Sequence, residues 1–466
     1  MTDPSFRIDY RIRALVICVV VPTMCFLARH FNLDDSLIYA RYIEHALQGR
    51  GLEFNPGEPV NALTSILNTW LVLGASTLLG GRVILAQVFL SGIFLLAANL
   101  IAESIVPLSG IFLSIGTFLY FCNGMETSLF LLILILCVNA YLSGRINWLP
   151  LLCTLALLTR FEGGAMGAII AWQLWKSRRF PKLIAYLPCL LLLTFYSFFN
   201  LHYYHAWLPQ SASAKLVQGM SGFWGKWPTA FLHVWDVVYL PITGSWIYIP
   251  LLLLFAWHGA KDPSLTERSK IVVPFLSILA AFYILFNIPP YFWYYAPFVF
   301  FLTIYAIRVI PRTKAGYLGF FLIAFCLLDI GASRLHHSGP GSRELGQLGD
   351  WMDRHSLGVN DYARMGDWIE HNTSANATVA TSETGTIGWH CDRYIIDMVG
   401  LTTPQNARYT AHGDYSSWLA ERPDYVVVHK LRPFPWETVA VASPDYEYVP
   451  VSFGDVFLLR RKPPAP

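Results

Sequence analysis

The chain separates into two parts by its pattern of hydrophobic and polar positions. From residue 14 to residue 330, apolar runs on the scale of a membrane helix follow one another, mostly joined by short polar connections. The runs are 14–27, 63–79, 83–102, 108–121, 129–142, 148–158, 165–175, 183–200, 246–257, 271–286, 296–307 and 317–330. After residue 330 the apolar runs are short and alternate with polar residues, which is typical of a soluble domain.

The composition agrees with a membrane protein. Hydrophobic residues make up 55% of the 466 residues and charged residues only 14%, whereas a soluble domain carries about 25% charged residues. This excludes a water-soluble enzyme and a disordered chain, and a net charge of +3 with scattered basic residues excludes a nucleic-acid partner. All cysteines but Cys391 lie in apolar runs, so neither a disulfide framework nor a zinc site is predicted.

Basic residues predict which end of the helices faces the cytoplasm. They gather in three short connections, at 176–182, 261–270 and 308–314. Short basic loops stay in the cytoplasm. Alternating passes then place the first polar loop, residues 30–62, outside the cytoplasm, together with everything after residue 330.

The middle of the chain allows two arrangements, each with about eleven transmembrane helices. In one, 63–79 crosses the membrane and 148–175 is a single helix. In the other, 63–79 lies along the outer face and the long run breaks at the sequence Arg-Phe-Glu-Gly-Gly that begins at Arg160. The second is favoured because Arg160 and Glu162 are costly in the middle of a membrane helix and the double glycine favours a break. It also places Glu126 beside the outer loop.

The C-terminal part, residues 331–466, is expected to fold as a small extracytoplasmic α/β domain that follows a transmembrane domain over residues 1–330. The pattern predicts a helix over 362–372 and strands over 378–381, 394–398, 425–429 and 456–459. The predicted fold class is therefore mainly α, a polytopic membrane protein with one small α/β domain.

Asp34 and Asp35 form the most informative polar feature. They follow the first apolar run at the membrane surface, where a carboxylate is costly unless it has a function. There a carboxylate can act as general base on an acceptor hydroxyl or hold a divalent cation. The structural alternative is a helix N-cap. Arg41 follows about two helical turns later, and can pair with Asp35 or meet a phosphate.

Three further charged residues interrupt apolar runs. Glu126 either supplies a charge at a helix N-terminus or joins the acidic pair in an outer site. Arg160 and Glu162 either close a chain break as an ion pair or contact an anionic headgroup.

Aromatic residues accompany a fourth charge. Lys215 ends a polar and aromatic segment, 201–215, of the kind found at membrane–water interfaces. It either snorkels to the surface or meets a lipid phosphate. The aromatic run 291–295 either belongs to the same interface or stacks on a sugar ring or a polyprenyl chain.

Several motifs occur in an order that resembles a known family. After the acidic pair come YARYIEHALQGRGLEFNPGEPVNALTS, NGMETSLF, LLTRFEGG, HYYHAWLPQSASAK and, in the tail, IGWHCDRYIIDMVGLTTP. The chain resembles the GT-C glycosyltransferases that use polyprenyl-phosphate sugars, most of all the AftB-like and pilin arabinofuranosyltransferase group. The resemblance spans most of the chain.

The resemblance implies an inverting sugar transfer at the periplasmic face of a bacterial inner membrane. The donor would be a polyprenyl-phosphate sugar, with D-arabinofuranose as the expected sugar, and the acceptor a pilin or a cell-envelope glycan. No cofactor is implied, and a divalent cation stays open. The implied roles are general base for Asp34 or Asp35, donor-phosphate binding for Arg160, Lys215 and Arg41, and substrate positioning for Glu126, Glu162, Tyr204, His205 and Gln210.

Three other functions fit parts of the sequence. A transporter or flippase of lipid-linked sugars would also have about eleven helices, although such proteins usually show a repeat between halves, and no repeat is visible here. Another GT-C activity, such as mannosyl or aminoarabinose transfer, would keep the same site. An inactive envelope scaffold would need no acidic pair at the outer surface.

Overall fold

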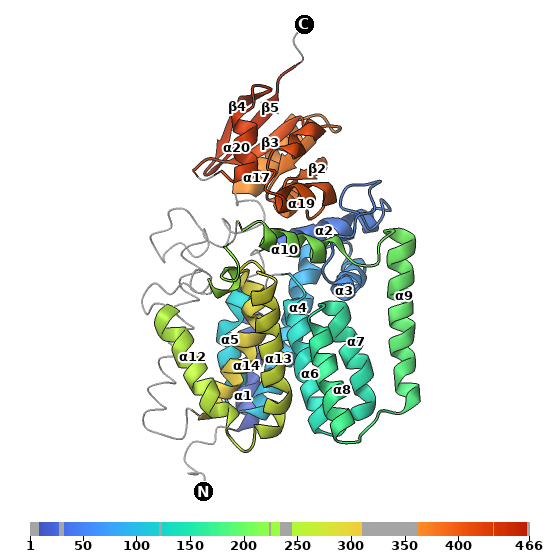
Figure 1. Ribbon diagram of the computed structural model, residues 1–466, viewed down its shortest axis with the longest axis vertical. Coiled ribbons are helices and arrows are strands. Elements are labelled where there is room, and N and C mark those ends of the chain that lie inside the picture. The colour runs from blue at the N-terminus through green and yellow to red at the C-terminus, as the bar shows by residue number, and fades with distance from the viewer. Residues whose placement is uncertain are drawn as a thin grey trace.

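A bundle of helices and an α/β domain at one of its ends make up the protein in this computed structural model (Figure 1). The structure describes residues 9–27, 32–120, 124–222, 225–233, 245–309, 361–431 and 433–463. The expected apolar run 317–330 and the expected domain boundary at residue 330 lie outside these residues. The count of about eleven passes therefore stays a prediction.

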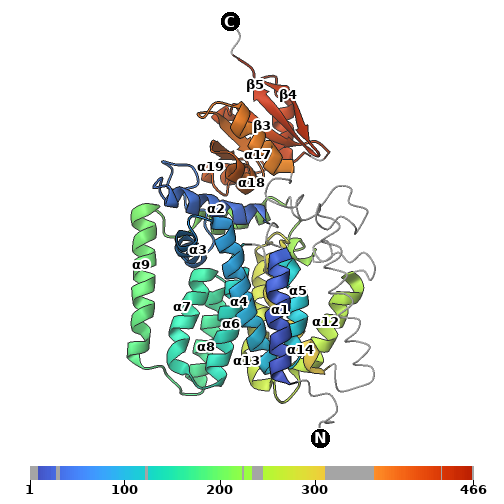
Figure 2. The same ribbon diagram turned by 180° about the vertical axis from the view of Figure 1, so that it is seen from behind.

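The bundle consists of apolar helices that run roughly along the long axis of the molecule (Figures 1 and 2). They are α1 (Tyr10–Leu27), α4 (Val83–Ile105), α5 (Ser109–Tyr120), α6 (Thr127–Leu142), α7 (Leu149–Thr159), α8 (Gly163–Lys176), α9 (Leu187–Tyr203), α12 (Ser245–Ala260), α13 (Thr266–Leu285) and α14 (Phe292–Val309). Among the described residues, three helical segments are long and apolar enough to cross a membrane: Val83–Ile105, Leu183–Tyr203 and Thr266–Leu285.

Three other helices lie across this direction. They are α2 (Asp34–Leu47), α3 (Ile66–Leu78) and α10 (Gln210–Met220). α2 and α10 lie between the bundle and the C-terminal domain, and Figure 2 views α3 nearly end-on. The orientation of α3 agrees with the arrangement in which residues 63–79 lie along one face of the bundle.

The long run at 148–175 is broken where the sequence predicts. α7 ends at Thr159, and α8 begins at Gly163 and packs against α7. The packing is so close that a Cβ on Gly163 would lie 2.3 Å from the backbone of Ala156. Glycine at this position therefore lets the two short helices fold back on one another and leaves Arg160 in the turn between them.

The described parts of the basic connections, residues 176–182, 261–270 and 308–309, lie at the end of the bundle that is farthest from α2 (Figure 1). The backbone N–H of Lys182 donates to the side chain of Asn147, which joins the connections on either side of the α7–α8 pair. At the same end, Arg308 forms an ion pair with Asp262 at 3.3 Å. The two ends of the bundle therefore differ in charge, because the acidic pair begins α2 at the other end.

The C-terminal domain is built on a five-stranded sheet of order β2-β1-β3-β5-β4. β1 (Thr378–Thr381), β2 (Tyr394–Asp397) and β3 (Tyr425–His429) are parallel, and β5 (Val456–Arg461) pairs antiparallel with β3 and with β4 (Tyr446–Phe453). The helices are α17 (Asp361–Asn372), α18 (Thr384–His390), α19 (Pro404–Ala411) and α20 (Pro435–Ala442). Four strands agree with the predicted ones. β4 was not predicted, because this edge strand is half-exposed and contains Glu447 and Pro450.

Arg41 joins α2 to the C-terminal domain. Its side chain is only 1% exposed, and it donates to the carbonyl oxygens of Phe54 at 2.8 Å, Cys391 at 3.0 Å and Arg393 at 2.7 Å, and also to that of Gly388. These bonds connect α2 and the first loop to the chain that follows α18. Arg41 therefore fixes the position of the C-terminal domain on the bundle.

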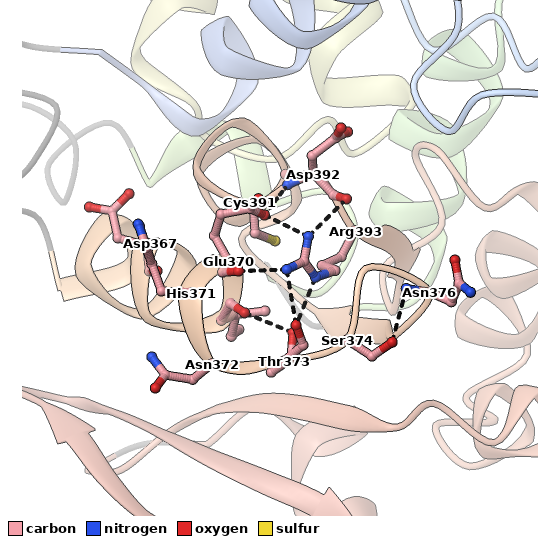
Figure 3. A network of polar contacts seen from close by, with 12 residues as sticks. Asp367, Glu370, His371, Asn372, Thr373, Ser374, Asn376, Cys391, Asp392 and Arg393 are labelled. Atoms are coloured by element: carbon pink, nitrogen blue, oxygen red, sulfur yellow. Dashed lines mark hydrogen bonds and ion pairs between the residues drawn. The ribbon is translucent and has the colours of Figure 1, made fainter.

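The chain after α18 is also held within the C-terminal domain, and further contacts join that domain to α2. Figure 3 shows the guanidinium of Arg393 turned toward Glu370 and Thr373, to which it donates at 2.7 and 3.1 Å. A Cβ on Gly385 would lie 1.9 Å from the carbonyl oxygen of Asp34, so α18 approaches α2 where only glycine fits. A continuous apolar cluster also runs from Ile38 and neighbouring residues of α2 into the sheet.

We predict that Arg41→Ala destabilises the protein by about 3 kcal/mol or more, because several buried carbonyl groups lose their donor. Arg50→Ala is the matched control. Arg50 pairs with Asp392 at 2.7 Å in a partly exposed position, and exposed pairs contribute about 0–1 kcal/mol. Thermal unfolding of the two purified variants measures the difference, and equal losses for both would contradict the role assigned to Arg41.

Candidate active site

The acidic pair lies against the loop that follows β1. Asp34 accepts hydrogen bonds from the backbone N–H groups of Thr386 at 2.6 Å and Gly385 at 3.1 Å. These residues belong to the first turn of α18, whose own N-cap residue, Glu383, makes no side-chain capping bond. Asp34 thus caps a helix of the C-terminal domain. The N-cap position of its own helix is Leu33.

Lys215 of α10 faces Asp35. Its Nζ lies 3.6 Å from Oδ2 of Asp35, and the Lys215 side chain is 13% exposed. The ammonium also lies over the ring of Tyr291 at 4.3 Å and near that of Trp293 at 6.0 Å. Aromatic faces attract a cation, so the aromatic run after α13 helps to hold Lys215 toward the acidic pair rather than toward solvent.

Arg160 sits at the break between α7 and α8 between two carboxylates. It pairs with Glu126 at 3.0 Å and with Glu162 at 2.9 Å. Tyr39 donates to Glu126 at 3.3 Å and Tyr283 donates to Glu162 at 2.9 Å. The ion pair between Arg160 and Glu162, one of the two roles predicted for these residues, is therefore present. Glu126 is a second partner of Arg160. This network holds three buried charges in compensating positions.

An apolar cavity of about 460 Å³ lies beside this network. Its polar wall includes Arg160, Glu162 and Lys215. Its remaining wall comes mainly from apolar residues of α8, α10 and α13 and their connections: Phe161, Gly164, Ala165, Leu208, Ala212, Leu216, Ile278, Leu279, Phe282 and Ile288. Phe161, Leu208, Ile278 and Phe282 are also exposed on the outside of the bundle. The cavity therefore borders an apolar outer surface. Arg160 and Lys215, which were both expected to bind the donor phosphate, therefore line the same cavity.

A second cavity, of about 510 Å³, lies between the bundle and the C-terminal domain. Asp34, Asp35 and Lys215 line it from the bundle side, and Glu383 lines it from the loop after β1. Its other residues follow all three parallel strands and include Thr384, Asp397, Val399, Leu401, Phe434 and Trp436. The carboxyl ends of parallel strands are where α/β domains bind ligands. Lys215 lines both cavities, so the two approach one another at its ammonium group.

Burial changes the acidity of this cluster. Burial, assisted by the charge of Asp35, raises the pKa of Asp34 to about 7, against the opposing effect of the hydrogen bond from Thr386. Burial and the charges of Asp34 and Asp35 also raise the pKa of Glu383 well above its usual range. The Asp34 carboxyl consequently exchanges its proton near neutral pH, and the charge states of Asp34 and Glu383 influence one another.

The remaining sequence candidates lie elsewhere. Tyr204 donates to the carbonyl of Leu52 at 2.7 Å, and Gln210 donates to that of Gly400 at 3.5 Å. His205 is exposed at a positive φ of 54°. None of these three residues, nor Arg41, lines either cavity. Tyr204 supports the first loop, and Gln210 and Arg41 support the interface with the C-terminal domain.

Glu383 is the main functional candidate that sequence reasoning missed. It stands in a Ser-Glu-Thr-Gly turn between a short strand and a short helix. The available signal was this turn after the first parallel strand of an α/β domain. Within the described residues, no group of three or more His, Cys, Asp or Glu side chains has an arrangement that could hold a metal ion.

Comparisons with known proteins agree with the fold. Residues 350–462 match the model of a family described as a domain of unknown function (DUF8728), and no curated protein sequence matches the chain. ArnT from Cupriavidus metallidurans bound to undecaprenyl phosphate is similar with a TM-score of 0.58 and 12% identity, over 97% of this chain and 98% of that one. The apo state of the same protein is similar with a TM-score of 0.51 and 13% identity, over 96% of this chain and 97% of that one.

A third similar structure is the arabinofuranosyltransferase AftD from Mycobacteria. The TM-score is 0.44 at 12% identity, over 98% of this chain and 40% of that one. The two ArnT structures cover nearly the whole of both chains, and they show that this chain has an ArnT-like fold, with apolar helices and a C-terminal mixed sheet.

Proposed function

We propose that the protein is a GT-C glycosyltransferase that transfers a sugar from a polyprenyl-phosphate donor to an acceptor hydroxyl. The observation that carries the proposal is the position of Lys215, which lines an apolar cavity on one side and faces Asp35 in an acidic cavity on the other. The shared fold with ArnT, whose structure holds undecaprenyl phosphate, supports the same class of donor.

The apolar cavity is the proposed donor site. Its walls suit a prenyl chain, and its border with exposed apolar residues gives that chain a path to the bilayer. Lys215 is the cation that receives the phosphate. Arg160 supports it from the wall of the same cavity, although both terminal nitrogens of Arg160 already pair with carboxylates.

Asp35 is the proposed general base. Both oxygens of Asp34 accept backbone hydrogen bonds, so Asp34 positions α18, whereas Asp35 faces Lys215. Asp35 takes the proton of the acceptor hydroxyl, and the hydroxyl oxygen forms a bond with the anomeric carbon on the face opposite the phosphate. The bond between that carbon and the phosphate oxygen breaks, and polyprenyl phosphate leaves with the electron pair and the stabilisation of Lys215. The configuration at the anomeric carbon is inverted.

The motif resemblance supports D-arabinofuranose as the sugar and a relationship to the AftB-like and pilin arabinofuranosyltransferase group. A labelled polyprenyl-phosphate arabinofuranose incubated with the purified protein tests this, beside mannosyl and aminoarabinosyl donors. Transfer of label to an acceptor distinguishes an enzyme from a transporter or flippase, which would move the donor across a vesicle without breaking its glycosidic bond.

We predict that the basic end of the bundle faces the cytoplasm and that both cavities and the C-terminal domain face the periplasm of a bacterial inner membrane. Ser416 is exposed in the C-terminal domain. A Ser416→Cys variant should react with a membrane-impermeant thiol reagent once the outer membrane is permeable and the inner membrane is intact. Reaction only after the inner membrane is opened would place the C-terminal domain in the cytoplasm and contradict this prediction.

We predict different pH profiles for the two aspartates. Asp35→Asn should lower turnover by about 10²–10⁴-fold at every pH, because the base is lost. Wild-type activity should fall as the pH drops below about 7, where Asp34 takes up a proton and no longer accepts both backbone bonds. Asp34→Asn should keep measurable turnover and lose this fall near pH 7, because the group that takes up the proton there is absent. The reverse pattern would make Asp34 the base.

We predict that Lys215→Gln weakens donor binding by about 10–100-fold, which corresponds to the loss of one charge-assisted contact. Lys226→Gln is the matched control, because Lys226 is exposed and lines neither cavity. Binding of a polyprenyl-phosphate sugar to each purified variant gives the comparison. Equal affinities would place the phosphate elsewhere. Arg160 is less suitable for this test, because its loss leaves Glu126 and Glu162 buried without a cation.

A further inference from the structure

The acidic cavity contains hydrogen-bonding groups that the transfer mechanism does not use. Gln218 is 4% exposed and Thr384 is 3% exposed, and both line the cavity. The Oε1 of Gln218 and the Oγ1 of Thr384 are buried without a hydrogen-bond partner in the described structure. Buried polar groups in proteins nearly always have a partner, so these two side chains indicate a ligand with hydroxyl or amide groups.

The carboxyl of Glu383 is a third polar group of the cavity that lacks a partner within the described residues. Its carboxyl lines the cavity, and within the described residues no side chain forms a hydrogen bond or an ion pair with it. The backbone N–H of Glu383 donates to the hydroxyl of Thr381 at 3.1 Å, and the neighbouring Ser382 donates to Glu437 at 2.6 Å. The loop is therefore held from within the C-terminal domain, which leaves the Glu383 carboxyl available to a ligand.

Aromatic rings form the apolar part of the same wall. Tyr291 and Trp293 stack with ring centroids 4.7 Å apart, and Phe434 and Trp436 stack at 5.0 Å. All four residues line the cavity, the first pair from the bundle and the second from the C-terminal domain. Flat apolar surfaces beside a few polar groups are typical of small-ligand sites. They suit the C–H faces of a sugar ring, whose hydroxyl groups point outward from the ring edge.

The charges of the cavity select against an anion. Four carboxyl side chains line it, namely Asp34, Asp35, Glu383 and Asp397, whereas Lys215 is the single cationic residue among its described lining. Burial and mutual repulsion already raise the pKa values of Asp34 and Glu383, so the cavity disfavours negative charge, and a phosphate or carboxylate on the acceptor would add to that charge in a partly buried site. A neutral acceptor meets no such repulsion.

We propose that this cavity binds a neutral sugar residue as the acceptor, and that Glu383 of the C-terminal domain positions it by accepting hydrogen bonds from adjacent hydroxyl groups. The proposal rests on the transferase function and assigns its acceptor class: a hydroxyl of a neutral glycan, in preference to a phosphorylated glycolipid or a serine or threonine of a protein. Glu383 is a positioning residue, since Asp35 is the base.

The first experiment compares acceptors. The wild-type protein receives a polyprenyl-phosphate sugar together with neutral octyl glycosides of hexoses and pentoses, with the same glycosides carrying a phosphate, or with a serine-rich and threonine-rich peptide. We expect transfer to at least one neutral glycoside and none to its phosphorylated form. Transfer to the peptide or the phosphorylated glycoside without transfer to any neutral glycoside would overturn the proposal, as would no transfer to any probe.

The second experiment tests Glu383. Glu383→Gln keeps the shape of the side chain and should raise the acceptor KM about 10–100-fold, with the donor KM unchanged. Thr384→Val should raise the acceptor KM by a smaller factor. Glu447→Gln is the control, because Glu447 pairs with Arg460 in an exposed position on the edge strand. An unchanged acceptor KM in Glu383→Gln, or a change confined to the donor KM, would contradict the assignment.

Hydrolysis of the donor by water distinguishes a failure of the acceptor assignment from a failure of the transferase function. If the wild-type protein hydrolyses a polyprenyl-phosphate sugar slowly without acceptor, the donor half of the transferase function stands and only the acceptor assignment is at risk. If it neither hydrolyses nor transfers any such sugar, the transferase function itself is wrong. The control Glu447→Gln should leave this slow hydrolysis at the wild-type rate.

Discussion

The buried guanidinium of Arg41 fixes the arrangement on which the acidic cavity depends. It reaches carbonyl oxygens of the first loop and of three residues in the C-terminal domain, which are more than 330 positions away in the chain. A cation removed from water needs such acceptors, so donor and acceptors hold one another in place. Because α2 carries both Arg41 and the acidic pair, the same bonds set the distance between Asp34 and the first turn of α18.

The main features of the fold could be predicted because they depend on local patterns. Apolar runs gave the helices of the bundle, and the Arg-Phe-Glu-Gly-Gly sequence gave the turn between α7 and α8. The parallel strands are short, and each contains three consecutive buried residues, since both of their faces are covered. β4 escaped prediction because an edge strand needs neither continuous burial nor the absence of proline. How α2 and α10 lie across the bundle follows from tertiary contacts, which no local pattern contains.

The candidate site was predictable to a similar extent. Charges that are costly at a membrane surface, such as the acidic pair, Arg160 and Lys215, do line the two cavities. Arg41 is equally unusual in the sequence, but it serves the domain interface. The sequence marks a charge as unusual and does not say which groups that charge contacts. Glu383 stands in a domain where charged residues are ordinary, so composition gave no reason to single it out. Its role follows from the position of the loop after β1 above the acidic pair.

The position of Lys215 in the walls of both cavities has a consequence for the order in which molecules come and go. The apolar cavity borders the outer surface of α8 and α13, whereas the acidic cavity lies under the C-terminal domain. Under the proposed function, a spent lipid carrier would diffuse sideways into the bilayer while a sugar chain stays seated beneath the sheet. In that case one carrier could replace another without release of the growing end, so the proposed function together with two cavities that share Lys215 is compatible with processive extension of a glycan.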